Sequence, residues 1–97
     1  MKYKVVILES AVQQIKEIKN YLEPLSGQAA VRIPQQIMKQ ISALEDRAMM
    51  YQVYEKNPAY RRLFVENYTV FYRILDEEET VKVYQVLHSM MDASRRI

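Results

Sequence analysis

Residues 60–92 read YRRLFVENYTVFYRILDEEETVKVYQVLHSMMD, and this stretch decides the fold. Three runs in it, 60–65, 68–75 and 80–87, are rich in the β-branched and aromatic residues that are typical of strands. The pair Glu66-Asn67 separates the first two runs, and the acidic residues 76–79 separate the last two. Such short connections indicate hairpins, so the stretch predicts an antiparallel meander of three strands.

The middle run carries apolar side chains on both faces. Successive side chains of a strand alternate, which groups Tyr68, Val70, Tyr72 and Ile74 on one face and Thr69, Phe71, Arg73 and Leu75 on the other. Neither group is purely polar. We therefore expect a central strand that is covered on both sides.

The N-terminal part of the chain predicts a strand followed by a helix. Residues 2–8 (KYKVVIL) are typical of a strand. Ser10 followed by Gln13 matches a capping box, which predicts that a helix begins there. We expect about 12–14 residues of helix, ending near Glu23-Pro24, because the residue before a proline disfavours the helical conformation.

A second helix is expected from a cap at Ser26. A single apolar stripe supports it, formed by Ala30, Ile33, Ile37, Ile41 and Leu44. Pro34 lies within this stripe, so we expect either a kink or a later start. Residues 46–58 show no clear period and predict a connecting loop, with Met49, Met50 and Tyr51 as its anchors.

These expectations combine into one α+β domain over residues 1–97, in the order β-α-α-β-β-β. The two helices would form an antiparallel hairpin. Their apolar stripes would pack on a mostly antiparallel sheet of about four strands, with the N-terminal strand added beside the meander.

Composition excludes several classes of site. Cysteine is absent, and His88 is the only histidine, so we expect no disulfide, structural zinc site or cysteine nucleophile. Gly27 is the only glycine, which excludes a glycine-rich phosphate loop, and we expect no cofactor. No apolar run is long enough for a signal peptide or a membrane span, so we expect a cytoplasmic protein without a membrane partner.

The order of these elements, together with particular motifs, resembles the RelE/ParE superfamily of bacterial type II toxins over essentially the whole chain. The motifs are ESAVQQIKEIKNYL, then SGQAAVR, then YRRLFVENYTVFYRI, and finally VYQVLHSMMD. The resemblance implies a small toxin that a cognate antitoxin wraps and neutralises in a hetero-oligomer. An apolar groove with a basic rim would suit such a partner segment, which folds as it binds.

The superfamily implies two chemistries: RelE-like members cut messenger RNA on the ribosome without a metal, and ParE-like members poison DNA gyrase. A ribonuclease needs an acid, a base and cations that stabilise the phosphorane, and the candidates here are Arg61, Arg62, Arg73 and His88. However, Thr69 replaces the arginine that RelE-like nucleases place after the hairpin tyrosine. Ser89, Met90 and Met91 replace their basic residues after the last strand.

The closing stretch VLHSMMDASRRI and the start of the second helix are more similar to ParE-like members. We therefore place gyrase inhibition slightly ahead of ribosome-dependent messenger RNA cleavage, and lean against an enzyme. An interaction module that has lost its toxicity is the third alternative. The candidates for partner binding are Arg61, Arg62, Arg73, Arg95 and Arg96. For His88 the alternative is a structural role, bonded to Asp92 or to backbone in the turn.

Overall fold

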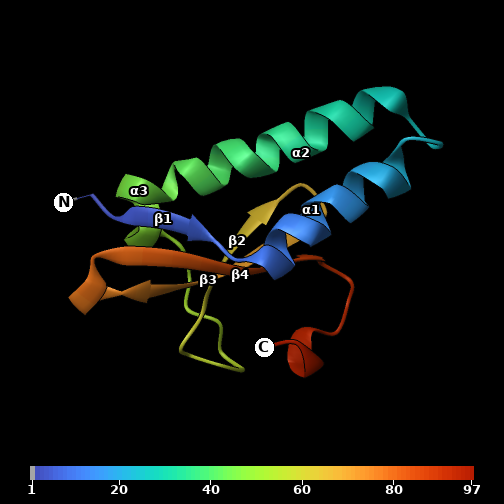
Figure 1. The fold of residues 1–97 in the computed structure, drawn as a ribbon. Helices are drawn as coiled ribbons and strands as arrows, with labels where there is room; N and C mark the ends of the chain where they lie inside the picture. The colour runs from blue at the N-terminus through green and yellow to red at the C-terminus, as the bar shows by residue number, and fades with distance from the viewer. Residues whose placement is uncertain (1) are drawn as a thin grey trace.

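The computed structural model describes residues 2–97, without the side chain of Arg95. Its elements are β1 (Lys4–Ile7), α1 (Glu9–Leu22), α2 (Gly27–Ser42), α3 (Leu44–Arg47), β2 (Arg61–Val65), β3 (Tyr68–Leu75) and β4 (Thr80–His88), with the short 3-10 turns η1 (Ala48–Met50), η2 (Asp76–Glu78) and η3 (Ala93–Arg95). The α+β order is confirmed, with the single turn α3 added after α2 (Figure 1).

The four strands form one sheet in the order β1-β4-β3-β2. The meander is confirmed, because β2 and β4 both pair antiparallel with β3. Strand β1 lies parallel to β4, from Lys4 beside Thr80 to Ile7 beside Val83. The sheet is therefore mostly antiparallel, with β3 and β4 at its centre.

Both faces of the sheet are covered, but unequally. In Figure 1 the two long helices lie side by side on one face, and the loop after α3 and the C-terminal segment lie beyond the other. Val70, Tyr72 and Val83 are buried beneath the helices. The second face, here called the open face, buries a smaller cluster of Tyr54, Phe71, Leu87 and Ala93. The expectation of a central strand covered on both sides is confirmed.

The start of α1 differs from its prediction. The helix begins at Glu9, and its cap residue Leu8 makes no side-chain hydrogen bond to the helix. Ser10 therefore lies inside the first turn, where its hydroxyl donates to the Tyr84 carbonyl at 2.6 Å. Gln13 donates to the Glu9 carboxylate at 2.8 Å. The predicted capping box is wrong, because Ser10 bonds to the sheet instead of to its own helix.

Helix α2 confirms one expectation and corrects another. The Ser26 hydroxyl accepts a hydrogen bond from the Ala29 N–H at 3.2 Å, so the predicted cap is confirmed. The helix does not start later, because it begins at Gly27 and continues unbroken through Pro34 (Figure 1). Pro34 has no N–H, so the Ala30 carbonyl lacks its helical hydrogen-bond partner. The free energy gained by burying the apolar stripe exceeds the cost of that one lost bond.

The segment after α2 is anchored differently from the prediction. Met49 and Met50 are 61% and 71% exposed, so they are not anchors, whereas Tyr51 is half-buried against the core as predicted. Ala48 is buried, and its carbonyl accepts a hydrogen bond of 2.7 Å from the buried Tyr72 hydroxyl. Burial raises the pKa of Tyr72 well above its usual value, as expected for a phenol that donates to backbone inside the core.

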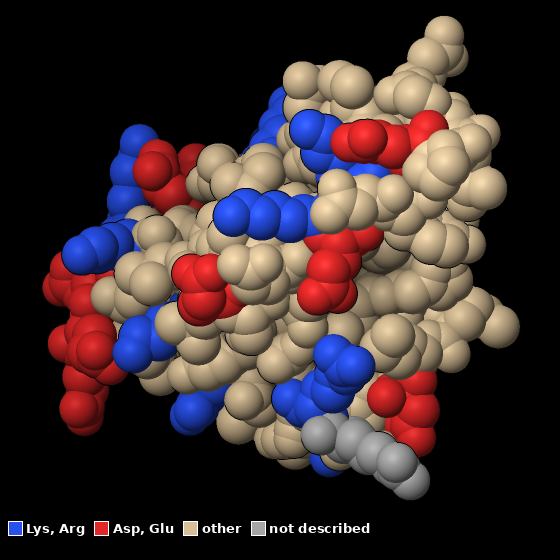
Figure 2. All heavy atoms as spheres, turned by 45° about the vertical axis from the view of Figure 1, so that its right-hand side comes forward, with Lys and Arg blue, Asp and Glu red and all other residues tan. Residues whose placement is uncertain are grey.

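Charge is dispersed over the surface. Figure 2 shows blue and red side chains intermixed on one face, with acidic groups gathered at its left edge. This pattern agrees with the net charge of only +2. Within residues 2–97 no helix is both long and apolar enough to cross a bilayer.

We predict that Tyr72→Phe lowers the free energy of unfolding by about 1–2 kcal/mol, because it leaves the buried Ala48 carbonyl unpaired. Urea denaturation of the purified chain measures this change. Tyr51→Phe is the matched control, since that ring packs against the same core from the same segment, and we expect a change below about 0.5 kcal/mol. Equal stabilities of Tyr72→Phe and the parent chain would contradict the role given to the hydroxyl.

Candidate functional site

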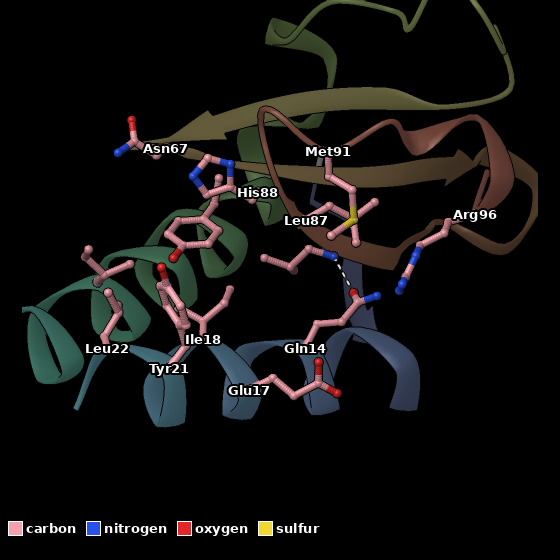
Figure 3. A pocket seen from close by; sticks show the side chains of 13 residues that line it. Gln14, Glu17, Ile18, Tyr21, Leu22, Asn67, Leu87, His88, Met91 and Arg96 are labelled. Carbon is pink, nitrogen blue, oxygen red and sulfur yellow. Dashed lines mark hydrogen bonds between the residues drawn. The ribbon is translucent and has the colours of Figure 1, made fainter. Parts of the chain in front are cut away.

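Two cavities lie on either side of the end of β4, and His88 lines both of them. The larger, here called the α1 groove, has a volume of about 640 Å³ and lies between α1 and the end of β4 (Figure 3). The smaller, here called the Arg62 pocket, has a volume of about 180 Å³. It lies on the open face, among residues of β2, β3 and the C-terminal segment.

The α1 groove exists because β1 is shorter than β4. Strand β1 ends opposite Val83, so beyond that point β4 keeps β3 on one side and has no neighbouring strand on the side of β1. Two side chains of α1 take its place. Ser10 donates to the Tyr84 carbonyl, and the Gln14 side-chain oxygen accepts from the Val86 N–H at 2.6 Å, the dashed line of Figure 3.

The groove is apolar with a charged rim. Ile18, Leu22 and Tyr68 contribute to its apolar lining. Glu17 from α1 and Arg96 from the C-terminal segment carry charges at its rim (Figure 3). Burial raises the pKa of Tyr68, so this hydroxyl stays protonated at neutral pH. A cavity of this size and lining suits an amphipathic ligand better than a small ion.

His88 is exposed, and its ring is fixed by two contacts. The ring packs edge-on against Tyr68, with centroids 5.5 Å apart. Its Nδ1 accepts a hydrogen bond from the Met90 N–H at 3.1 Å, so the neutral ring carries its proton on Nε2. The expected bond to backbone in the turn is confirmed. Asp92 instead accepts from the Ser94 N–H, which holds the pKa of the Asp92 carboxyl below its usual value.

Arg61 and Arg62 point to opposite faces of β2, as alternation requires. Arg61 donates to the Tyr51 carbonyl at 2.6 Å and, at 3.5 Å, to that of Met49. It therefore holds the segment after α3 against the sheet. The Arg62 guanidinium lies on the open face, 5.4 Å from the Tyr54 ring centroid and 5.3 Å from that of Phe64.

The remaining candidates are dispersed. The Arg73 guanidinium lies over the rings of Tyr60 and Tyr84, at 5.7 and 5.9 Å from their centroids, and does not line either cavity. Arg96 lines the α1 groove. The side chain of Arg95 lies outside the described part of the chain. Of the predicted site residues, the structure thus brings together Arg62 with His88 at one cavity, and Arg96 with His88 at the other.

Sequence reasoning missed Lys56, Phe64 and Gln14. Lys56 lines the Arg62 pocket from a loop whose sequence has no period, so no pattern indicated its position. Phe64 is 56% exposed and lies beside Arg62. Alternation along β2 puts these two side chains on one face, so this signal could have indicated their contact. Gln14 has no distinguishing sequence pattern, and its side-chain oxygen accepts the Val86 N–H of β4. No group of three or more potential metal ligands comes together among the residues searched, those that the structure describes.

We predict that Arg61→Gln lowers the free energy of unfolding by about 1–3 kcal/mol, since it releases a charged hydrogen bond to a half-buried carbonyl. Thermal or urea unfolding measures the loss. Arg32→Gln, which removes an exposed ion pair with Glu66, is the control and should cost about 0–1 kcal/mol. Unchanged stability of Arg61→Gln together with lost toxicity would show that Arg61 has a direct functional role instead.

The fold is shared with solved toxin structures. The chromosomal ParDE toxin–antitoxin system of P. aeruginosa contains a chain 16% identical, with a TM-score of 0.78 over 90% of this chain and 96% of that one. A double arginine-to-alanine mutant of E. coli toxin RelE in the free state is 18% identical, with a TM-score of 0.65 over 98% and 90% of the two chains.

A third example is the archaeal RelE–RelB complex of Pyrococcus horikoshii, 13% identical, with a TM-score of 0.68 over 95% of this chain and 100% of that one. No curated protein matches the chain. The family described as the ParE toxin of the type II toxin-antitoxin system, parDE, matches residues 5–93. The chain therefore belongs to the ParE toxin family of type II toxin–antitoxin systems.

Proposed function

We propose that the chain is a cytoplasmic toxin that inhibits DNA gyrase and does not cut messenger RNA. The observation that carries this choice is that two of the three candidate arginines are held away from His88, which leaves Arg62 and Lys56 as the cations beside it. Arg61 is bonded to loop carbonyls, Arg73 is stacked on two tyrosines, and Thr69 provides a hydroxyl on the open face. A metal-free ribonuclease needs several cations converging on one phosphate, because each contributes orders of magnitude in rate.

The α1 groove supports the second part of the proposal, that a cognate antitoxin neutralises the chain. Its apolar lining along α1 and β4 suits a partner segment that folds on binding. Glu17 on one side and Arg96 on the other offer opposite charges at its rim, which would fix the direction of such a segment. The resulting assembly is a toxin–antitoxin hetero-oligomer.

We predict that expression of the chain alone arrests growth and that co-expression with the neighbouring reading frame restores it. In arrested cells we expect covalent gyrase–DNA complexes to accumulate while messenger RNA stays intact, which immunoprecipitation and transcript-end mapping measure. Transcripts cut at codon boundaries without trapped gyrase would instead establish the ribonuclease alternative. Neither effect, with growth unimpaired, would establish an interaction module without toxicity.

We predict that Tyr21→Asp weakens antitoxin binding by about tenfold or more, because a charge then enters the apolar lining of the α1 groove. Leu25→Asp is the matched control, since Tyr21 and Leu25 are both 66% exposed and only Tyr21 lines the groove. Titration of a labelled antitoxin fragment measures both affinities. Similar losses for the two variants would place the antitoxin contact outside the α1 groove.

A further inference from the structure

Part of the open face has no cover. In Figure 1 the end of the β3–β4 hairpin projects beyond the loop before β2 and the C-terminal segment, which lie beneath the rest of that face. Val6 and Leu75, on the open face near this end, are half-buried and belong to neither hydrophobic cluster. This part of the sheet, here called the hairpin face, therefore has no packing partner within the described part of the chain.

Three cations lie on the hairpin face without an anion. Lys82 of β4 is flanked by Arg73 of β3 on one side and by Val6 of β1 on the other. Lys4 lies on the same face, two residues before Val6 along β1. Among the described residues no carboxylate lies within 4.0 Å of any of these cations. Like charges directly opposite each other on neighbouring strands are destabilising, so the pair of Arg73 and Lys82 is unfavourable in the isolated chain.

The contacts of Arg73 leave its charge available. Its guanidinium lies over the rings of Tyr60 and Tyr84, 5.7 and 5.9 Å from their centroids. Such cation–π contacts fix the plane of the guanidinium but do not neutralise it, and the N–H donors at its edge stay free to bind an anion. A sheet that keeps two opposed cations on an uncovered face indicates an anionic partner for that face.

The chain carries a matching anionic surface of its own. The turn between β3 and β4, residues 76–79, consists of four exposed acidic residues. Asp76 accepts a hydrogen bond of 3.0 Å from the Tyr3 hydroxyl, and among the described residues the other three form no ion pair. About 7 Å of strand, from Thr80 to Lys82, separates this turn from the cations of its own chain. A second copy that is turned end for end can place its turn directly on them.

We infer that two copies of the chain associate through their hairpin faces, with the acidic turn of each copy on Lys4, Lys82 and Arg73 of the other. The two-fold axis then runs across the strands, because an axis along the strands would place cations on cations and carboxylates on carboxylates. Val6 and Leu75 of both copies are covered in the same contact. The inference goes beyond the proposed function, since it involves neither gyrase nor the α1 groove.

The contact is held mainly by exposed charges, so the association is weak and depends on salt. Sedimentation velocity of the purified full-length chain measures it, at protein concentrations up to about 0.5 mM. We expect dimers whose association weakens by about tenfold or more when NaCl is raised from about 0.05 M to about 0.5 M. A chain that stays monomeric throughout this range would overturn the inference.

Charge reversal on the hairpin face tests the site itself. Lys4→Glu combined with Lys82→Glu should weaken the dimer by about tenfold or more. This variant should fold, because the new carboxylate faces Arg73 and replaces a like-charged pair with an opposite one. Lys16→Glu combined with Lys19→Glu makes the same change of net charge on the exposed side of α1, and we expect a loss of less than about twofold. Equal losses in the two double variants would reveal unspecific repulsion and overturn the site.

The reciprocal variant tests the orientation of the two copies. Glu77→Lys combined with Glu78→Lys reverses the charge of the turn, and it should weaken the dimer by about as much as the variant of the hairpin face. An equimolar mixture of these two double variants should restore dimers, because each then meets opposite charge on both halves of the interface. A mixture that stays monomeric would overturn the arrangement.

A different acidic partner would give a different result. A chain that stays monomeric, and whose Lys4 and Lys82 amide NMR signals shift with a hexaglutamate peptide, would assign the hairpin face to such a partner and overturn self-association. Dimers that persist in all of the charge-reversal variants would place the contact elsewhere and overturn it as well. Neither outcome affects the proposed function, because trapped gyrase and antitoxin affinity are measured separately.

Discussion

The arrangement of this molecule depends on how the edge of β4 is completed. Strand β4 has nine residues and β1 only four, so the parallel pairing ends at Val83. The side chains of Ser10 and Gln14 provide the missing partners at Tyr84 and Val86, and the second bond is partly buried, where an unpaired backbone group would be costly. These two bonds hold α1 across the end of the sheet. The position of α1 in turn creates the groove at that end and sets where α2 can pack.

The same constraint explains what sequence reasoning could and could not predict. Strands and hairpins follow from local patterns, because alternation along 68–75 and the short connections on either side of it need no distant partner. The role of Ser10 does not follow, since its partner Tyr84 is 74 positions away. A serine near the start of a helix fits the sequence pattern of a cap, whether its hydroxyl bonds to its own helix or to a distant strand. Ala48 was missed as an anchor for a similar reason, because its carbonyl bonds to the distant Tyr72.

The arginines show where sequence predicts a site and where it does not. Alternation along β2 accounts for the separation of Arg61 from Arg62, since side chains of neighbouring strand residues point to opposite faces. What each guanidinium contacts could not be predicted. Arg61 meets carbonyls of a loop without sequence pattern, and Arg73 meets Tyr60 and Tyr84 across two other segments. Carbonyls and rings hold a guanidinium without neutralising it, so counting arginines overestimates how many are free to bind phosphate.

The two faces of the sheet bury different amounts of apolar side chain, so they contribute unequally to stability. Most of the buried side chains lie between the helices and the sheet, including Ile37, Ile41 and Tyr72. Among the described residues the hydrophobic cluster of the open face has only four buried members, and one of these, Ala93, belongs to the C-terminal segment. Substitutions on the open face therefore remove less apolar burial than substitutions beneath the helices. A chain with this architecture can therefore accept changes of side chain on its open face, while the packing beneath the helices keeps the fold.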